Sequence, residues 1–156
     1  MAAMAMTILA SGAGAAKAQT AYQTVTFRVN PISEIAVSGS PAPIVIDAPR
    51  GAAETRAQMP GTSYAITTNE GHQKITVALD RAMPAGVALA VSLGAPSGAT
   101  SRGSVPLGTQ AVDAVTAIPV GSGRALPIVY TLSATSAARQ GAAGTRLVTY
   151  TVTAGL

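Results

Sequence analysis

The sequence contains no cysteine, few aromatic residues and few charges. Without cysteine the chain forms no disulfide and performs no thiol chemistry. Aromatic residues make up only 3% of the chain, so a hydrophobic core must be built from valine, isoleucine, leucine and alanine. The 156 residues fit one domain. A domain of this length buries roughly two thirds of its unfolded surface, so a real core is expected.

Charges of either sign are scattered along the chain. Ten lysine and arginine residues and six acidic residues give a formal net charge of +4. No two basic residues are adjacent, and they are not interleaved with aromatic residues. The sequence therefore predicts neither a nucleic-acid interface nor a polybasic membrane patch.

The residues that could act in catalysis or bind a metal do not form any known motif. The single histidine, His72, lies beside Glu70 in an expected turn and lacks the further ligands that a zinc site needs. No serine is framed by a G-x-S-x-G motif, and no acidic residues form a D-x-D cluster. Residues 121–123 resemble a fragment of a phosphate-binding loop, but no helix is expected after them. We therefore expect a protein that is not an enzyme and uses no metal and no cofactor. The alternative is a hydrolase, which would need a pocket that gathers His72 with an acidic residue and a serine.

The N-terminal segment has the pattern of a secretion signal. Residues 2–16 are apolar or small throughout, and Ala16, Lys17 and Ala18 have the small-x-small form of a signal-peptidase site. We therefore expect residues 1–18 to be a signal peptide and residues 19–156 to be the mature domain. The predicted location is extracellular or at the cell surface, with the periplasm in transit. An amphipathic or membrane-lying N-terminal helix is the alternative. After cleavage we expect no membrane contact and no anchor beyond the last strand.

Alternation of apolar and polar residues with period two dominates the rest of the chain. This pattern is typical of antiparallel strands with one buried face. Inward faces are expected at Ile75, Val77 and Leu79, at Val87, Leu89, Val91 and Leu93, at Leu126, Ile128, Tyr130 and Leu132, and along residues 146–153. Further strands are expected at residues 22–30, 32–38, 44–46 and 64–68, with a short edge strand at 104–107. About eight or nine strands without a convincing helix predict a single antiparallel β-sandwich, either immunoglobulin-like or a jelly roll.

Turn residues predict how several of these strands are connected. Residues 69–72 have the composition of a four-residue turn, so we expect strands 64–68 and 75–79 to form a hairpin. Residues 48–61 are expected to form a loop or a single helical turn. Residues 112–120 remain ambiguous because Pro119 interrupts the pattern. Pro127 predicts an edge strand or a strand start, because proline cannot donate to a sheet ladder.

Four segments carry a resemblance to known proteins: residues 35–39, 64–69, 83–89 and 148–153. In these segments the chain is similar to a group of small uncharacterised secreted bacterial β-proteins. The secretion signal, the threonine-rich strands and the strand-like C-terminus also resemble pilus subunits and spore-coat-U-like proteins. Such subunits commonly carry a disulfide, whereas this chain has no cysteine. The resemblance implies a secreted β-sandwich and identifies no functional residue.

The leading functional hypothesis is a structural subunit of an extracellular fibre, pilus, coat or matrix that assembles with copies of itself by exchanging a terminal strand. Terminal strands are the easiest to donate to a neighbouring sheet edge. The candidate assembly residues are Val25, Phe27 and Val29 in the first expected strand and Val148, Tyr150 and Val152 in the last. The competing interpretation is that the first strand completes its own sheet in a monomer.

A second hypothesis is a secreted adhesin or ligand-binding module for a glycan or surface polymer. It would use two long loops of small residues, at 94–108 and 134–144. Sugar-binding sites usually stack rings on exposed aromatic side chains. The five aromatic residues all fall on expected strands and none lies in these loops, which favours the first hypothesis.

Overall fold

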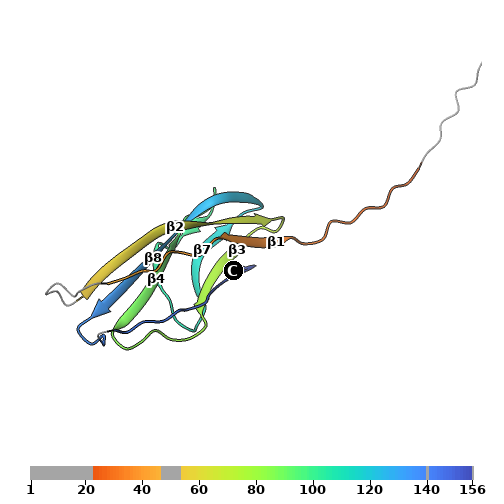
Figure 1. Cartoon of the computed structure of the whole chain (residues 1–156). Helices are drawn as coiled ribbons and strands as arrows, with labels where there is room; N and C mark the ends of the chain where they lie inside the picture. Colours follow the sequence, from red (N-terminus) through yellow and green to blue (C-terminus); the bar gives the residue numbers. More distant parts are fainter. Residues whose placement is uncertain (1–22, 47–53, 140, 156) are drawn as a thin grey trace, which may run out of the picture.

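The computed structural model describes residues 23–46, 54–139 and 141–155 (Figure 1). This part of the chain forms nine strands: β1 (Ser33–Ser38), β2 (Glu54–Thr68), β3 (Gln73–Leu79), β4 (Val87–Leu93), β5 (Thr100–Ser101), β6 (Ser104–Pro106), β7 (Val112–Ile118), β8 (Gly121–Thr135) and β9 (Val148–Ala154). No helix occurs in the described ranges, and so none there could cross a membrane. The predicted all-β sandwich is confirmed.

The strands form two antiparallel sheets. The five-stranded sheet has the order β1-β2-β8-β4-β6, and the four-stranded sheet has the order β5-β7-β3-β9. From β3 onward, each strand lies in the sheet opposite to that of the strand before it. The immunoglobulin arrangement keeps three consecutive pairs of strands in one sheet. The strand order therefore favours the jelly-roll form of the prediction over the immunoglobulin form.

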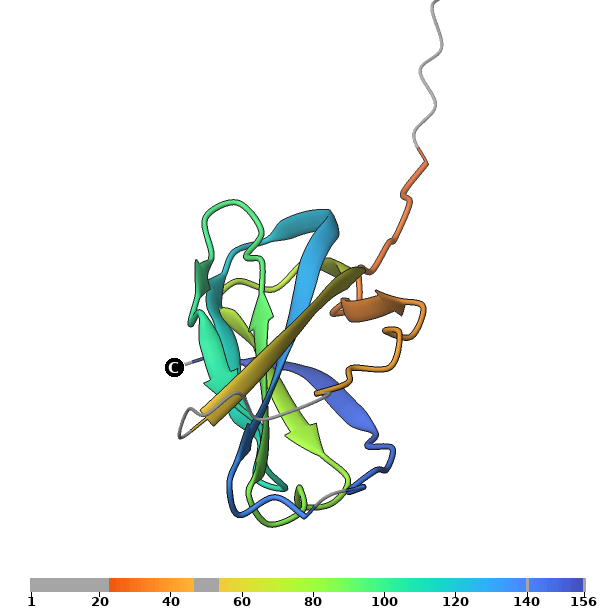
Figure 2. The same cartoon turned by 60° about the vertical axis from the view of Figure 1, so that its left-hand side comes forward.

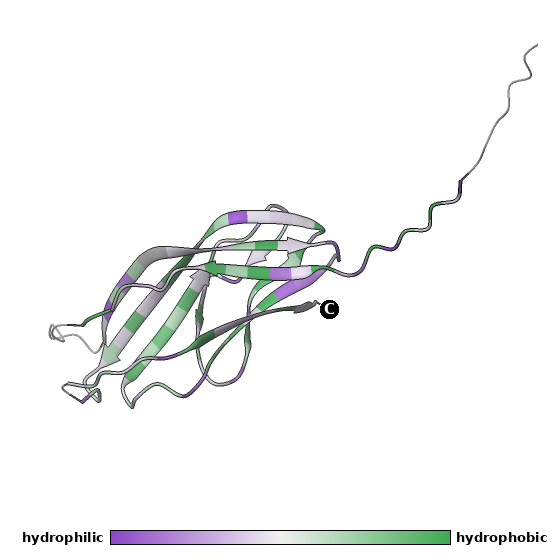
Figure 3. Ribbon diagram, turned by 45° about the vertical axis from the view of Figure 1, so that its right-hand side comes forward, coloured by the Kyte–Doolittle hydropathy of each residue, from purple (hydrophilic) through white to green (hydrophobic). Residues whose placement is uncertain are grey.

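The core lies between the sheets and follows the predicted alternation. Figure 3 shows hydrophobic and hydrophilic residues alternating along the strands. The buried apolar side chains include Ile75, Val77 and Leu79 of β3, Leu89, Val91 and Leu93 of β4, Ala114, Val115 and Ile118 of β7, and Ile128 and Tyr130 of β8. Successive side chains of a strand point to opposite faces of its sheet. The inward-facing side chains of the two sheets therefore meet and form one continuous hydrophobic core. The expected inward faces of β3 and β4 are confirmed, as are Ile128 and Tyr130 of β8.

The predicted hairpin between residues 64–68 and 75–79 is wrong. The connection has the expected four residues, since β2 ends at Thr68 and β3 begins at Gln73. The two strands nevertheless lie in different sheets and do not pair. Tyr64 and Ile75 are both buried, so the inward faces of the two strands meet across the core instead of side by side. The turn therefore bridges the sheets.

Two further strand predictions need correction. Strand β2 begins at Glu54, inside the expected loop 48–61, whose residues 48–53 lie outside the described part of the chain. Residues 44–46 form no strand, although Ile44 packs against the core. The ambiguous segment 112–120 contains β7, which ends just before Pro119.

Pro127 does not mark a sheet edge, which corrects another expectation. It lies within β8, a central strand between β2 and β4. Pairing with β4 ends where Leu93 faces Ile128, and the β2–β8 register shifts just beyond Tyr64. The proline therefore lies where the β4–β8 ladder ends, and there the Gly94 carbonyl accepts a hydrogen bond from the Tyr64 hydroxyl.

Candidate functional site

Residues 23–32 form an N-terminal tail that extends away from the sandwich (Figures 1 and 2). The expected strand at 22–30 is therefore wrong for residues 23–30, and Tyr22 lies outside the described residues. Val25, Phe27 and Val29 are 74%, 84% and 71% exposed. An alternating apolar sequence that is suited to a sheet thus has no strand partner within the described chain.

Asn69 fixes the base of this tail through three hydrogen bonds. The Ile32 N–H donates to Asn69 Oδ1 at 2.7 Å, and the Asn69 backbone N–H donates to the Ile32 carbonyl at 3.0 Å. The Asn69 side-chain amide also donates to the Asn30 carbonyl at 2.9 Å. These bonds continue the β1–β2 ladder beyond the Ser33–Thr68 pair, so the tail leaves in line with β1. The sequence identifies Asn69 as a turn residue and does not predict its contact with the tail.

Strand β9 carries the other three candidate assembly residues. It pairs with β3 over its whole length and forms the last strand of its sheet. Val148, Tyr150 and Val152 are half-buried and pack against the core, whereas Thr149, Thr151 and Thr153 are exposed. On the side away from β3, its backbone has no strand partner among the described residues, and we call this side the free edge of β9. The tail and β9 of one chain do not pair with each other.

Two tyrosine hydroxyls join the sheets at this edge. Tyr130 of β8 and Tyr150 of β9 share a hydrogen bond between their hydroxyl groups. Burial raises the pKa of Tyr150, and the bond to Tyr130 raises this pKa further. Burial also raises the pKa of Tyr130, although the bond to Tyr150 opposes that shift. Both hydroxyls therefore stay protonated at neutral pH and hold β9 against the opposite sheet.

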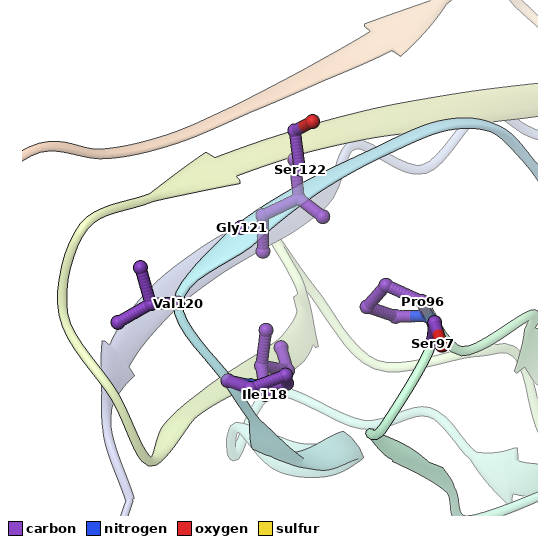
Figure 4. Close-up of a pocket in the computed structure, with 8 residues that line it drawn as sticks. Pro96, Ser97, Ile118, Val120, Gly121 and Ser122 are labelled. Carbon is purple, nitrogen blue, oxygen red and sulfur yellow. The ribbon is translucent and has the colours of Figure 1, made fainter.

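A small cavity lies at one end of the sandwich (Figure 4). It has a volume of about 290 Å³ and is lined by Ile66, Pro96, Ser97 and residues 118–122. No titratable side chain lines it, and Figure 4 shows the Ser122 hydroxyl directed away from the hollow. The cavity therefore offers no charged group to a ligand.

The polar residues considered in the sequence do not gather into a site. His72 is exposed in the turn between β2 and β3. Lys74 and Asp113 form an ion pair between β3 and β7, with 3.2 Å between Lys74 Nζ and Asp113 Oδ1. Within the described ranges, no group of three or more His, Asp or Glu residues could hold a metal ion.

The two long loops leave the sandwich at opposite ends of β4. Ala134, where the second loop begins, pairs with Val87 at the start of β4. Gly94, where the first loop begins, follows Leu93 at the end of β4. A seven-residue strand separates its ends by about 20 Å, so the starting points of the two loops lie apart. Part of the first loop also joins the two sheets, as β5 in the four-stranded sheet and β6 in the five-stranded sheet.

Comparisons with known proteins identify no relative of this chain. No family model matches it, and no curated protein or solved structure gives a significant match. The resemblance to secreted bacterial β-proteins therefore stays an expectation from the sequence. The exposed tail and the free edge of β9 are the features that bear on function.

Proposed function

We propose that this protein is a non-enzymatic structural subunit of an extracellular fibre, pilus, coat or matrix, whose copies join by donating a terminal strand. The exposed tail is the observation that carries the proposal. It presents Val25, Phe27 and Val29 to solvent on a chain segment without strand partners among the described residues. Large exposed apolar surfaces usually mark interaction sites.

The physical chemistry of the tail favours pairing with another sheet. An extended segment gains backbone hydrogen bonds when it adds to an exposed sheet edge. Burying a valine or phenylalanine side chain contributes about 1.5–3 kcal/mol. Three such side chains offset much of the entropy that is lost when the tail becomes ordered.

The sequence of the tail matches a segment that this fold already places at a sheet edge. Both segments contain a valine, a threonine, an aromatic residue, one further residue and a second valine, in that order. These are residues 25–29 in the tail and residues 148–152 in β9. The tail emerges from the end of the sandwich in line with β1. Donation from this end to a different surface of the next copy is a head-to-tail contact, and such contacts build rings or filaments.

The extracellular location rests on residues 1–18, which lie outside the described part of the chain. The pattern of a secretion signal in these residues supports the location. Few charges and the absence of cysteine also suit a domain that is held by packing and by assembly rather than by disulfides.

Deletion of residues 19–29 tests the proposal. The mature chain is expected to form regular filaments or oligomers in electron microscopy and on a sizing column. The deletion variant is expected to stay monomeric and to keep its β-sheet circular dichroism, because residues 23–29 belong to no strand of the sandwich. A matched control replaces Thr24 and Thr26 by serine and leaves the apolar face intact. Polymers that form equally well without the tail would overturn the proposal.

A further inference from the structure

We propose that residues 23–30 of one copy pair with the free edge of β9 in a second copy, and that Asn69 directs the tail away from its own β9. The proposal rests on the proposed function and names its acceptor surface. It assigns Asn69 a positioning role and treats the tail as a ligand for one defined sheet edge.

The lengths of the edge strands favour β9 as the acceptor. The five-stranded sheet ends in β1 and β6, and the four-stranded sheet ends in β5 and β9. Strands β5 and β6 have two and three residues, which is too short to pair with an eight-residue segment. Strand β1 has six residues, of which only Ile35 packs against the core. Strand β9 has seven residues, three of which do so.

The side chains of the tail and β9 are complementary in either direction of pairing. Each segment places an aromatic residue midway between two valines on one face. When Phe27 lies beside Tyr150, both tail valines lie beside the valines of β9, whether the strands run parallel or antiparallel. Cross-strand pairs of aromatic and β-branched side chains stabilise sheets. Val148, Tyr150 and Val152 are only half-buried in the single chain, so the added strand covers their remaining exposed surface.

The base of the tail lies near the end of its own β9, but hydrogen bonds keep the tail pointing away from that strand. The Gly155 N–H, just beyond β9, donates to the His72 carbonyl at 2.6 Å. The end of β9 therefore lies at the same turn that carries Asn69. To reach its own β9, the tail must reverse at residues 30–32. The hydrogen bonds of Asn69 to Asn30 and Ile32 oppose this reversal because they keep the segment extended.

Disulfide crosslinking tests the acceptor edge, and the absence of native cysteine makes every disulfide informative. The mature Thr26→Cys variant is mixed with Thr149→Cys or Thr151→Cys and oxidised under assembly conditions. With Phe27 beside Tyr150, an antiparallel strand places residue 26 opposite residue 151, and a parallel strand places it opposite residue 149. A mixed disulfide with either position supports the proposal, and the preferred position gives the direction.

Ser104→Cys, at the exposed edge strand β6, is the matched control. Mixed disulfides with β9 are expected to exceed those with Ser104→Cys several-fold. Equal yields, or assembly without any β9 disulfide, would overturn β9 as the acceptor. The proposed function stands separately, because it fails only if deletion of the tail leaves assembly unchanged.

Asn69→Ala tests the positioning role. The readout is the intramolecular disulfide of a chain carrying both Thr26→Cys and Thr149→Cys at high dilution, because a tail folded back from the 69–72 turn runs parallel to its own β9. Loss of the two side-chain hydrogen bonds is expected to raise this closed form and to reduce assembly several-fold, since an intramolecular partner competes effectively. Thr67→Ala, at an exposed neighbouring position of β2, is the control and is expected to change neither.

Asn69→Asp gives a second, milder test because it keeps the oxygen acceptor for Ile32 and removes the amide donor to Asn30. An intermediate yield of the closed form is expected. If Asn69→Ala and Asn69→Asp keep the β-sheet spectrum and leave both the closed form and assembly unchanged, the positioning role is overturned.

Discussion

The tail and β9 have nearly the same sequence pattern and opposite environments. Val25, Phe27 and Val29 alternate with polar residues, as Val148, Tyr150 and Val152 do. In β9 the three side chains pack on the core, and the backbone pairs with β3 throughout. In the tail the side chains are more than two thirds exposed. Period-two alternation therefore predicts the capacity to form a strand, whereas the available edge decides whether the strand forms.

The largest expected difference between β9 and the tail is in how much an introduced charge lowers the free energy of unfolding. Val152→Asp places an ionised group on the half-buried face of β9 and is expected to destabilise the sandwich by about 3 kcal/mol. Val29→Asp, in the exposed tail, is expected to change the stability of the monomer by less than about 0.5 kcal/mol. Urea unfolding under monomeric conditions measures both values.

The same pair of variants separates folding from assembly. Val29→Asp is expected to abolish assembly while the monomer folds normally, because its charge would have to enter the acceptor edge. Similar destabilisation by both variants would contradict the comparison, because it would mean that the tail already packs in the single chain.

A smaller effect is expected when the tail is given a tyrosine. Phe27→Tyr makes the tail resemble β9 more closely. In the monomer the new phenol is expected to ionise near pH 10, the ordinary tyrosine value. Burial raises the pKa of Tyr150 above that value and raises the pKa of Tyr64 to about 12. Ultraviolet titration should therefore show one added tyrosine that ionises before the buried ones. On assembly, its pKa should rise.

The raised tyrosine pKa values also determine how the stability of the fold changes at alkaline pH. Above pH 10 the unfolded chain loses phenol protons that the folded chain keeps, so stability is intact below that pH and falls as the pH rises. For Tyr64, with a pKa of about 12, the loss amounts to about 2 kcal/mol by pH 12. Tyr64→Phe should remove this part of the pH dependence, whereas Phe27→Tyr should add none in the monomer.

The sequence predicts strand faces well because they depend on local alternation. The buried faces of β3 and β4 follow directly from residues 75–79 and 87–93. The sequence predicts a loop for the first half of β2 because this segment is rich in small and charged residues and is bracketed by Pro49 and Pro60. This half becomes a strand because β8 offers a long edge, with Glu54 opposite Thr135. Pairing partners are decided by tertiary contacts that local sequence does not encode.

The candidate site shows the same division between local and long-range information. The apolar tail residues were found from their alternation, although the structure leaves them without a sheet. The role of Asn69 depends on bonds to residues 37 and 39 positions earlier in the chain. Its type and spacing indicate a turn, and nothing local indicates that it holds the base of the tail. Only the three-dimensional arrangement identifies that contact.

Amide hydrogen exchange of residues 23–30 in the monomer and in the assembled protein tests the central claim most directly. In the monomer these amides should exchange as fast as those of an unfolded chain, whereas the amides of β9 that bond to β3 should be protected. In the assembled protein, the tail should become protected to an extent similar to β9. A tail that stays unprotected in the assembled protein, or that is already protected in the monomer, would contradict strand donation.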